Sequence, residues 1–164
     1  MNRQHTLLVK RIEESGKELL AYLAEIPEKE IHESPAPGEW SVHSIMAHLR
    51  DTEREVFLKR IRLVLNGGEP AHVENFDQEE WNRQHYSPSE PLKKIVSELR
   101  AARRKELALL RELPDRKWSD YCIHPNYGKI SIEYIATHNY SHTLEHLRQM
   151  LERREQELIK KLNP

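Results

Sequence analysis

This 164-residue chain has little cysteine and glycine, and neither sign of charge is in clear excess. The single cysteine, Cys122, excludes an internal disulfide and is compatible with a reducing cytosol. The five glycines and the sparse β-branched residues favour helices over a sheet. Because the 26 basic and 27 acidic residues are interleaved without a basic block, the composition argues against a nucleic-acid-binding protein.

Long hydrophobic runs are missing as well. No apolar stretch approaches the roughly 18 residues of a membrane span, and the N-terminal residues lack the hydrophobic stretch of a signal peptide. The charged fraction is 32%, above the roughly 25% of an average globular protein. We therefore expect a soluble, cytoplasmic chain with no membrane partner, folded as one domain over residues 1–164.

Apolar residues recur at spacings of three, four and seven in four segments, which is the pattern of amphipathic helices. Pro27 ends the first segment, and Ser41 is the expected N-cap of the second. Ser87, with Glu90 three positions later, gives the third a capping-box signature, and Pro114 ends it. The expected helices span about 2–26, 41–65, 87–113 and 131–158.

Two connections are long for a compact helical protein. The first, residues 69–86, holds Phe76 and Trp81, so we expect it to pack on the helices and to contain a short helix at about 78–84. The second runs from 115 to 130, and a Ser/Pro/Gly loop at 34–38 joins the first two helices. Long connections of this kind often carry binding function.

Three of the ten histidines line one face of the fourth expected helix. A helix turns by about 100° per residue, so His138, His142 and His146 follow one another at intervals of about 40°. Neutral imidazole is a good ligand for zinc, nickel, copper and iron, and a pair at i and i+4 can reach one ion. The rise from His138 to His146 is about 12 Å, so the spacing leaves open whether the pair is His138/His142 or His142/His146.

A further ligand is expected from the second helix. His48 lies beside the apolar stripe and should point into the interior, whereas His43, about 140° around the helix, should face solvent. Ligand sites in helical bundles are commonly built from facing helices. The alternative for such inward imidazoles is a hydrogen-bond network, because burial without partners is costly.

Two segments, together with the loop between them, resemble a known family. Residues 40–49 (WSVHSIMAHL) match the pattern W-S-x-x-x-h-x-x-H-L, in which h is apolar, and residues 142–149 match H-x-x-x-H-x-x-Q. Between them, Trp118, His124-Pro125 and Gly128 follow the order W…H-P…G. In this order and spacing the chain is similar to the DinB-like superfamily over nearly its whole length.

The resemblance implies an all-α four-helix bundle with up-down-down-up topology, in which residues 69–86 form a long crossover between the second and third helices. It also implies one divalent metal ion on His48, His142 and His146, with His138 left as a pocket residue or as support for a ligand. Zinc or nickel are the leading candidates, followed by iron or manganese. Members of the family often form homodimers, so a homodimer is expected.

A three-histidine site leaves a coordination position open, as catalytic sites do. The resemblance implies a metal-dependent enzyme, either a hydrolase or a transferase that moves a low-molecular-weight thiol such as bacillithiol or mycothiol to a small electrophilic substrate. Hydrolysis normally needs a positioned carboxylate, for which Asp51 and Glu145 are candidates. Neither is unmistakable as an acid or base, which favours thiol transfer. A non-catalytic binding module of a stress response is the remaining alternative.

The other pocket candidates are polar or aromatic, and no residue is assigned as the general acid or base. Gln149 follows His146 by three positions and can bond a ligand, a substrate or water. Arg148 can hold a substrate carboxylate, although an exposed helix arginine is the simpler interpretation. The aromatic candidates for pocket walls, for each of which a place in the core is the simpler interpretation, are Trp40, Trp81, Trp118 and Tyr127.

Overall fold

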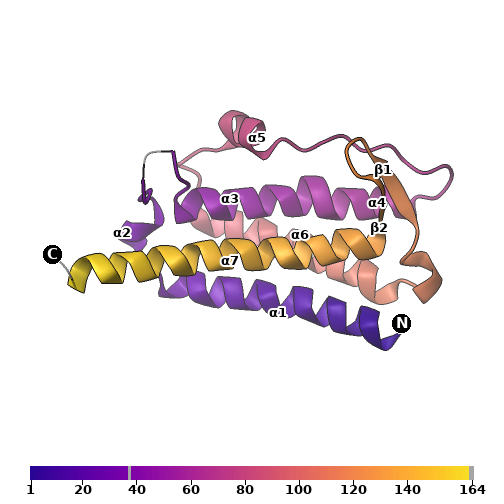
Figure 1. Cartoon of the computed structure of the whole chain (residues 1–164), viewed down its shortest axis with the longest axis horizontal. Helices are drawn as coiled ribbons and strands as arrows, with labels where there is room; N and C mark the ends of the chain where they lie inside the picture. The colour runs from indigo at the N-terminus through magenta and orange to yellow at the C-terminus, as the bar shows by residue number, and fades with distance from the viewer. Residues whose placement is uncertain (37, 163–164) are drawn as a thin grey trace.

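Four helical rods lie side by side in the computed structural model, which describes residues 1–36 and 38–162 (Figure 1). The rods are α1 (Arg3–Glu25), α3 (Val42–Thr52) continued by α4 (Lys59–Leu65), α6 (Leu92–Glu112) and α7 (Ile132–Leu162). The second and third rods run in the same direction, opposite to α1 and α7 (Figure 1). This order confirms the predicted four-helix bundle with up-down-down-up topology. Residue 37 of the predicted loop and residues 163–164 of the predicted domain lie outside the described residues.

The second rod is continuous but has an irregular middle. Between α3 and α4 the chain forms a π-helical segment, Glu53–Leu58. A π turn closes hydrogen bonds from i to i+5 and so holds one residue more than an α turn. At the start of the rod, the Ser41 hydroxyl accepts a hydrogen bond from the Ser44 backbone N–H at 3.2 Å, which confirms the predicted N-cap.

The third rod begins later than the sequence pattern indicated, and the predicted capping box is wrong. Residues 87–90 form a turn in which the Glu90 N–H donates to the Ser87 carbonyl at 3.1 Å. The Glu90 carboxylate accepts hydrogen bonds from Arg50 and Lys94, each at 2.8 Å, so it does not bend back to the cap. Helix α6 therefore starts after Pro91.

The fourth rod, α7, is longer than expected because it continues to Leu162. Like the other rods it is amphipathic rather than apolar. Among the described residues, no helix has an apolar stretch of the length that crossing a membrane requires.

The crossover between the second and third rods contains helix α5 (Gln78–His85), which confirms the short helix expected there. Trp81 Nε1 donates a hydrogen bond to Asp51 Oδ2 at 3.1 Å, and this bond fixes α5 against α3. In Figure 1 the crossover runs along the length of the bundle and carries α5 over α3. The crossover therefore packs on the helices, as predicted.

The prediction that His43 faces solvent is wrong, because its side chain is fully buried. Its Nδ1 lies 3.1 Å from the Tyr86 hydroxyl, and its Nε2 lies 2.8 Å from the Glu90 carbonyl oxygen. Both partners belong to the end of the crossover, which covers the outer face of α3. Helix α3 is consequently buried on every side.

The second long connection adds a small sheet to the helical fold. Strand β1 (Tyr121–His124) pairs antiparallel with β2 (Gly128–Ser131). Gly128 has φ 68°, a conformation that glycine adopts without strain at the turn between the strands. The Val73 N–H of the crossover donates to the Ile123 carbonyl at 2.9 Å, so the two connections hold each other. The remaining short elements are α2 (Glu28–Ile31) and the 3₁₀ turn Asp115–Lys117.

A buried polar layer divides the apolar core into two clusters along the bundle. One cluster contains Ile12 and Leu110 and lies toward the hairpin, and the other contains Leu19 and Ile45 and lies toward α2. Each rod passes from one cluster to the other at the level of the layer. The polar layer consists of Glu53, Arg103, Glu106, Asn139 and Thr143, all buried.

An ion pair organises the polar layer. The Arg103 guanidinium donates to the two Glu53 carboxylate oxygens at 2.6 and 2.8 Å and to the Thr143 hydroxyl at 3.0 Å. Asn139 Nδ2 donates to Glu53 at 3.2 Å and to Glu106 at 2.7 Å. Burial, reinforced by the negative charge of Glu53, raises the pKa of Glu106 well above its usual value. The layer thus places a neutral acid beside an ion pair.

Candidate metal centre

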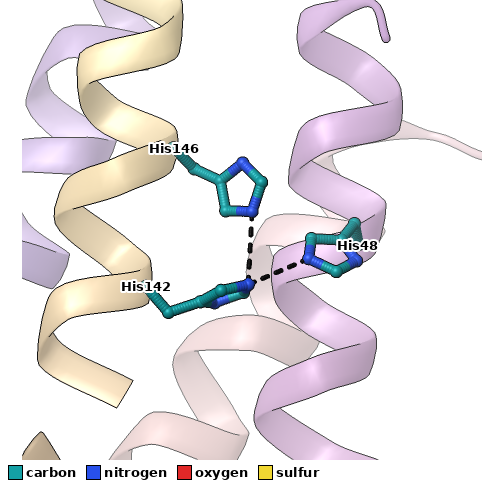
Figure 2. Close-up of side chains that lie close together, drawn as sticks. All are labelled: His48, His142 and His146. Atoms are coloured by element: carbon teal, nitrogen blue, oxygen red, sulfur yellow. Dashed lines mark hydrogen bonds between the residues drawn. The ribbon is translucent and has the colours of Figure 1, made fainter. Parts of the chain in front are cut away.

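Three histidines converge between the second and fourth rods (Figure 2). His48 projects from α3, and His142 and His146 project from successive turns of α7. His48 Nε2 lies 3.0 Å from His142 Nε2, which lies 3.2 Å from His146 Nε2. Among the described residues, this is the one group of three histidine, cysteine or carboxylate side chains whose ligand atoms all lie within 4.8 Å of one another.

Packing around the imidazoles fixes where they point. His48 is buried, and its ring meets the edge of Trp40 with centroids 4.9 Å apart. The ring of Phe57, one rod segment further on, lies edge-on against His142 at 5.6 Å. Aromatic rings therefore pack against two of the imidazoles, and His142 and His146 are partly exposed whereas His48 is buried.

Hydrogen bonding sets the tautomer of one ligand. Gln149 Oε1 lies 3.0 Å from His146 Nδ1, and an amide oxygen can only accept, so Nδ1 of this ring carries the hydrogen. His146 Nε2 is then a free lone pair directed at the other two rings. Such a support for a ligand imidazole is typical of metal sites.

The arrangement of the three Nε2 atoms fits a cation better than a network of neutral rings. His142 Nε2 has a single hydrogen or lone pair but has two nitrogen neighbours at about hydrogen-bond distance. It cannot satisfy both. Ligand bonds of about 2.0–2.1 Å in tetrahedral geometry would separate the nitrogens by about 3.3 Å, close to the spacing observed.

The electrostatics of the centre keep its imidazoles neutral. Burial, together with the neighbouring His146, lowers the pKa of His48 to about 3. Burial and the surrounding histidines lower the pKa of His142 to about 2. Burial also lowers the pKa of His146, although its bond to Gln149 acts in the opposite direction. Neutral rings have the lone pairs that a metal requires.

A cleft of about 440 Å³ opens beside the three histidines. His146, Trp40, Gln149 and Glu145 line it, so three of the predicted pocket residues lie where a substrate could reach the centre. The Trp40 ring is parallel to the His146 ring, with centroids 6.5 Å apart. The centre is thus open on one side and closed on the other.

His138 lies outside this group. Its ring contacts Phe57 and Tyr134 at centroid distances of 5.7 and 5.9 Å and lies 6.1 Å from His142. Spacing alone left two possible pairs on α7, and the structure brings His142 and His146 to His48. His138 remains a neighbour of the centre, on the hairpin side.

Asp51, although three residues after His48, does not serve the centre. Its carboxylate accepts from Arg50 Nε at 2.7 Å and from Trp81 Nε1 at 3.1 Å, so it holds the crossover in place. The same bond makes Trp81 a structural residue rather than a wall of the cleft. Arg148 is exposed at the rim of the cleft and pairs with Glu152 at 3.4 Å.

The structure does not place Tyr127 in the pocket. Tyr127 is 68% exposed on the hairpin turn and stacks on His124 with ring centroids 4.7 Å apart. Trp118 is also not a pocket wall, because it is 1% exposed and stacks on His5 in the core. Both residues lie in the hairpin connection, whose fold the helical pattern could not anticipate.

Sequence reasoning missed the polar layer that lies on the adjoining face of α7. A signal was available, because Glu53 occupies a stripe position between Leu49 and Val56. Arg103 likewise continues a stripe of leucines on α6. Charged residues at such positions on two facing helices predict a buried ion pair. Asn139 and Thr143 add α7 to the layer, and Thr143 directly follows the candidate ligand His142.

Comparison with known proteins gives the same fold and relatives whose names refer to metal dependence. A protein of Oceanobacillus iheyensis, named "Putative metal-dependent hydrolase OB0782", is 23% identical over 150 residues, which cover 90% of this chain and 86% of that protein. YfiT from Bacillus subtilis, described as a probable metal-dependent hydrolase with an unusual four-helix bundle topology, matches with a TM-score of 0.72 and 21% identity. That match covers 92% of this chain and 90% of YfiT.

A second solved structure, the four-helix bundle protein TT2238, matches with a TM-score of 0.65 and 19% identity over 90% of this chain and 98% of that one. At these identities the structural matches show the fold alone. The sequence model of the DinB superfamily matches residues 11–150, a span that includes His48, His142 and His146. The chain therefore belongs to the DinB superfamily.

Proposed function

We propose that this protein is a metal-dependent enzyme, in which a divalent cation on His48, His142 and His146 activates a nucleophile for reaction with a small electrophilic substrate. One observation carries the proposal: three neutral imidazole nitrogens converge on a point beside an open cleft. Lone pairs buried against one another are unfavourable without a cation between them. Zinc or nickel suits a site made of imidazoles, and iron or manganese is a further candidate.

The proposed reaction is transfer of a low-molecular-weight thiol. A bound divalent cation would supply a nucleophile at neutral pH by lowering the pKa of the thiol or water that it binds. Hydrolysis normally also needs a carboxylate that handles protons. Asp51 is committed to Arg50 and Trp81, so it is not available for that role. A thiol activated directly needs no such base.

Hydrolysis is the second candidate, and Glu145 favours it. This carboxylate lines the cleft beside His146 and is exposed to any substrate there. The names of the curated relative and of YfiT also refer to hydrolysis. A Glu145→Gln variant separates the two reactions: hydrolysis with Glu145 as base should fall about 10²-fold or more, whereas thiol transfer should be retained.

The chain's own residues prepare the centre. Gln149 holds the hydrogen of His146 on Nδ1, which leaves Nε2 free toward His48 and His142. Phe57 and Trp40 pack against the rings of His142 and His48 and hold their orientation. The substrate would approach through the cleft.

Metal analysis of protein purified without a histidine tag tests the foundation of this proposal. We expect one divalent ion per chain, absent from a His48→Ala/His142→Ala variant and retained in His138→Ala, which serves as the matched control. Protein that stays metal-free after incubation with zinc, nickel, iron or manganese would refute the proposal.

A substrate screen then identifies the reaction. Bacillithiol, mycothiol and glutathione are offered with a chromogenic electrophile, and a chromogenic ester is offered for hydrolysis. Turnover should stop when a chelator removes the metal. Ligand binding that survives the chelator, without turnover, would instead support a non-catalytic binding module.

A further inference from the structure

The cleft beside the three histidines has a strong charge of one sign. Four carboxylates line it: Glu39, Glu79, Glu145 and Glu152. The one cation among the lining residues is Arg148, which is paired with Glu152. Among the described residues, the carboxylates of Glu39, Glu79 and Glu145 form no ion pair. Their negative charge is therefore not neutralised and can attract a cation in the cleft.

The carboxylates come from three separate segments of the chain. Glu39 belongs to the loop before α3, Glu79 to the first turn of α5, and Glu145 and Glu152 to α7. They are therefore not one solvated helix face, in which acidic residues would be neighbours on a single helix. The crossover and the loop bring them together around the same opening.

A second and independent feature points to a ligand at this place. His146 belongs both to the cleft and to the group of three convergent imidazoles. Trp40 lines the cleft and packs against the rings of His146 and His48. An aromatic ring with carboxylates near it is the combination that binds organic ammonium groups, because the ring face and the carboxylates both attract positive charge.

We propose that this cleft prefers a small substrate that carries a positively charged amine over one of similar size in which a carboxylate takes the place of that amine. Four carboxylates against one guanidinium leave three negative charges, and a divalent cation at the histidines still leaves one. The amine would lie against Trp40 and the unpaired carboxylates Glu39, Glu79 and Glu145, and the reacting atom would point to the histidines. The identity of the reaction rests on the proposed function, but the charge preference of the cleft does not.

A metal-free measurement tests the charge preference directly. Tryptophan fluorescence of the full chain is quenched with N-methylpyridinium, a cationic aromatic probe, and with iodide, at low ionic strength. Subtracting the quenching of a Trp40→Phe variant isolates the signal of Trp40. We expect N-methylpyridinium to quench Trp40 about tenfold more effectively than iodide, relative to the ratio for free N-acetyltryptophanamide. The preference should weaken in 0.15 M salt, where the Debye length is about 8 Å.

Charge variants show whether the named carboxylates are responsible. Glu39→Gln/Glu79→Gln/Glu145→Gln should bring the quenching ratio close to that of the free fluorophore. The matched control, Glu18→Gln/Glu25→Gln/Glu112→Gln, removes the same charge from exposed positions that do not line the cleft and should leave the ratio unchanged. A wild-type ratio equal to that of the free fluorophore, or an equal effect of both triple variants, overturns the proposal.

A second measurement distinguishes failure of the charge preference from failure of the proposed metal-dependent function. Cobalt(II) is added to the metal-free protein, and the visible absorption of cobalt reports binding. Cysteamine, 2-mercaptoethanol and 3-mercaptopropionate, which differ in charge but are similar in size, are then titrated while thiolate-to-cobalt absorption is followed. We expect cysteamine to bind about tenfold more tightly than 3-mercaptopropionate. Absence of cobalt binding refutes the metal centre, whereas cobalt binding with equal or reversed thiol affinities refutes only the charge preference.

Discussion

Replacing Glu106 by glutamine should stabilise the protein relative to wild type, and increasingly so as the pH rises. Glu106 is fully buried in the polar layer and accepts a hydrogen bond from Asn139 at 2.7 Å. Its other oxygen has no donor among the described residues. Glutamine has the same shape, its carbonyl oxygen can accept the bond from Asn139, and its amide can donate to Glu53. The substitution therefore keeps the packing and removes only the ability to ionise.

The magnitude follows from proton binding in the two states. Burial, with the charge of Glu53, raises the pKa of Glu106 in the folded chain well above its usual value, whereas an unfolded glutamate ionises near pH 4.3. The stability contributed by the bound proton is complete below the unfolded pKa and is lost as the pH rises toward the folded pKa. One proton changes the free energy of unfolding by about 1.4 kcal/mol per pH unit. Above pH 5 the Glu106→Gln variant should therefore gain on wild type by about 1.4 kcal/mol for each pH unit over which Glu106 stays protonated in the folded chain.

Urea denaturation of metal-free wild type and Glu106→Gln at pH 5, 6 and 7 measures this difference, and the titration of all other groups cancels. The control is Glu112→Gln, an exposed glutamate whose substitution should leave a difference that does not change with pH. A Glu106→Gln difference that stays constant from pH 5 to pH 7 would show that Glu106 is ionised in the folded protein and would refute the reasoning.

Three further predictions concern the polar layer and the centre. Arg103→Met should lower the free energy of unfolding by about 3–5 kcal/mol in urea denaturation, because it leaves the Glu53 carboxylate buried without its partner; a loss below about 1 kcal/mol would contradict this. Gln149→Leu should weaken metal binding about 10–100-fold in competition with a chromophoric chelator, because His146 loses its acceptor; unchanged affinity would count against that role. Since the pKa of His48 is lowered to about 3, the folded ring stays neutral while the unfolded ring protonates below about pH 6.5. The metal-free protein should lose stability from about pH 6.5 downward, and less steeply in His48→Gln; equal slopes would argue against a neutral buried ring.

The bundle and the centre follow from local rules, and for that reason the sequence predicts them well. Apolar spacing marks each rod, and the i, i+4 relation puts His142 and His146 on one face of a helix whatever surrounds it. Local rules do not say which neighbouring turn meets His48. The family pattern indicated that choice, and the packing of α3 against α7 produces it.

The errors concern contacts made between distant segments. His43 was expected in solvent because its own helix predicts that face to be outside, yet the crossover covers it through Tyr86 and Glu90. Tyr127 was a candidate pocket wall because it is aromatic, but the hairpin carries it onto His124. The position of a long connection on a bundle depends on bonds such as that between Trp81 and Asp51. The pattern of a single helix does not predict such bonds.

The π-helical segment Glu53–Leu58 changes the rotation of one half of the second rod relative to the other half about the rod axis. One residue more or less in a helix rotates everything beyond it by about 100°. His48 and Phe57 lie on either side of the start of this segment, and both contact His142. A single-residue deletion there would leave both halves helical but would turn His48 and Phe57 to different sides. Length in this stretch is therefore under tighter constraint than composition, and evolutionary insertions should accumulate in the loops and not in the middle of this rod.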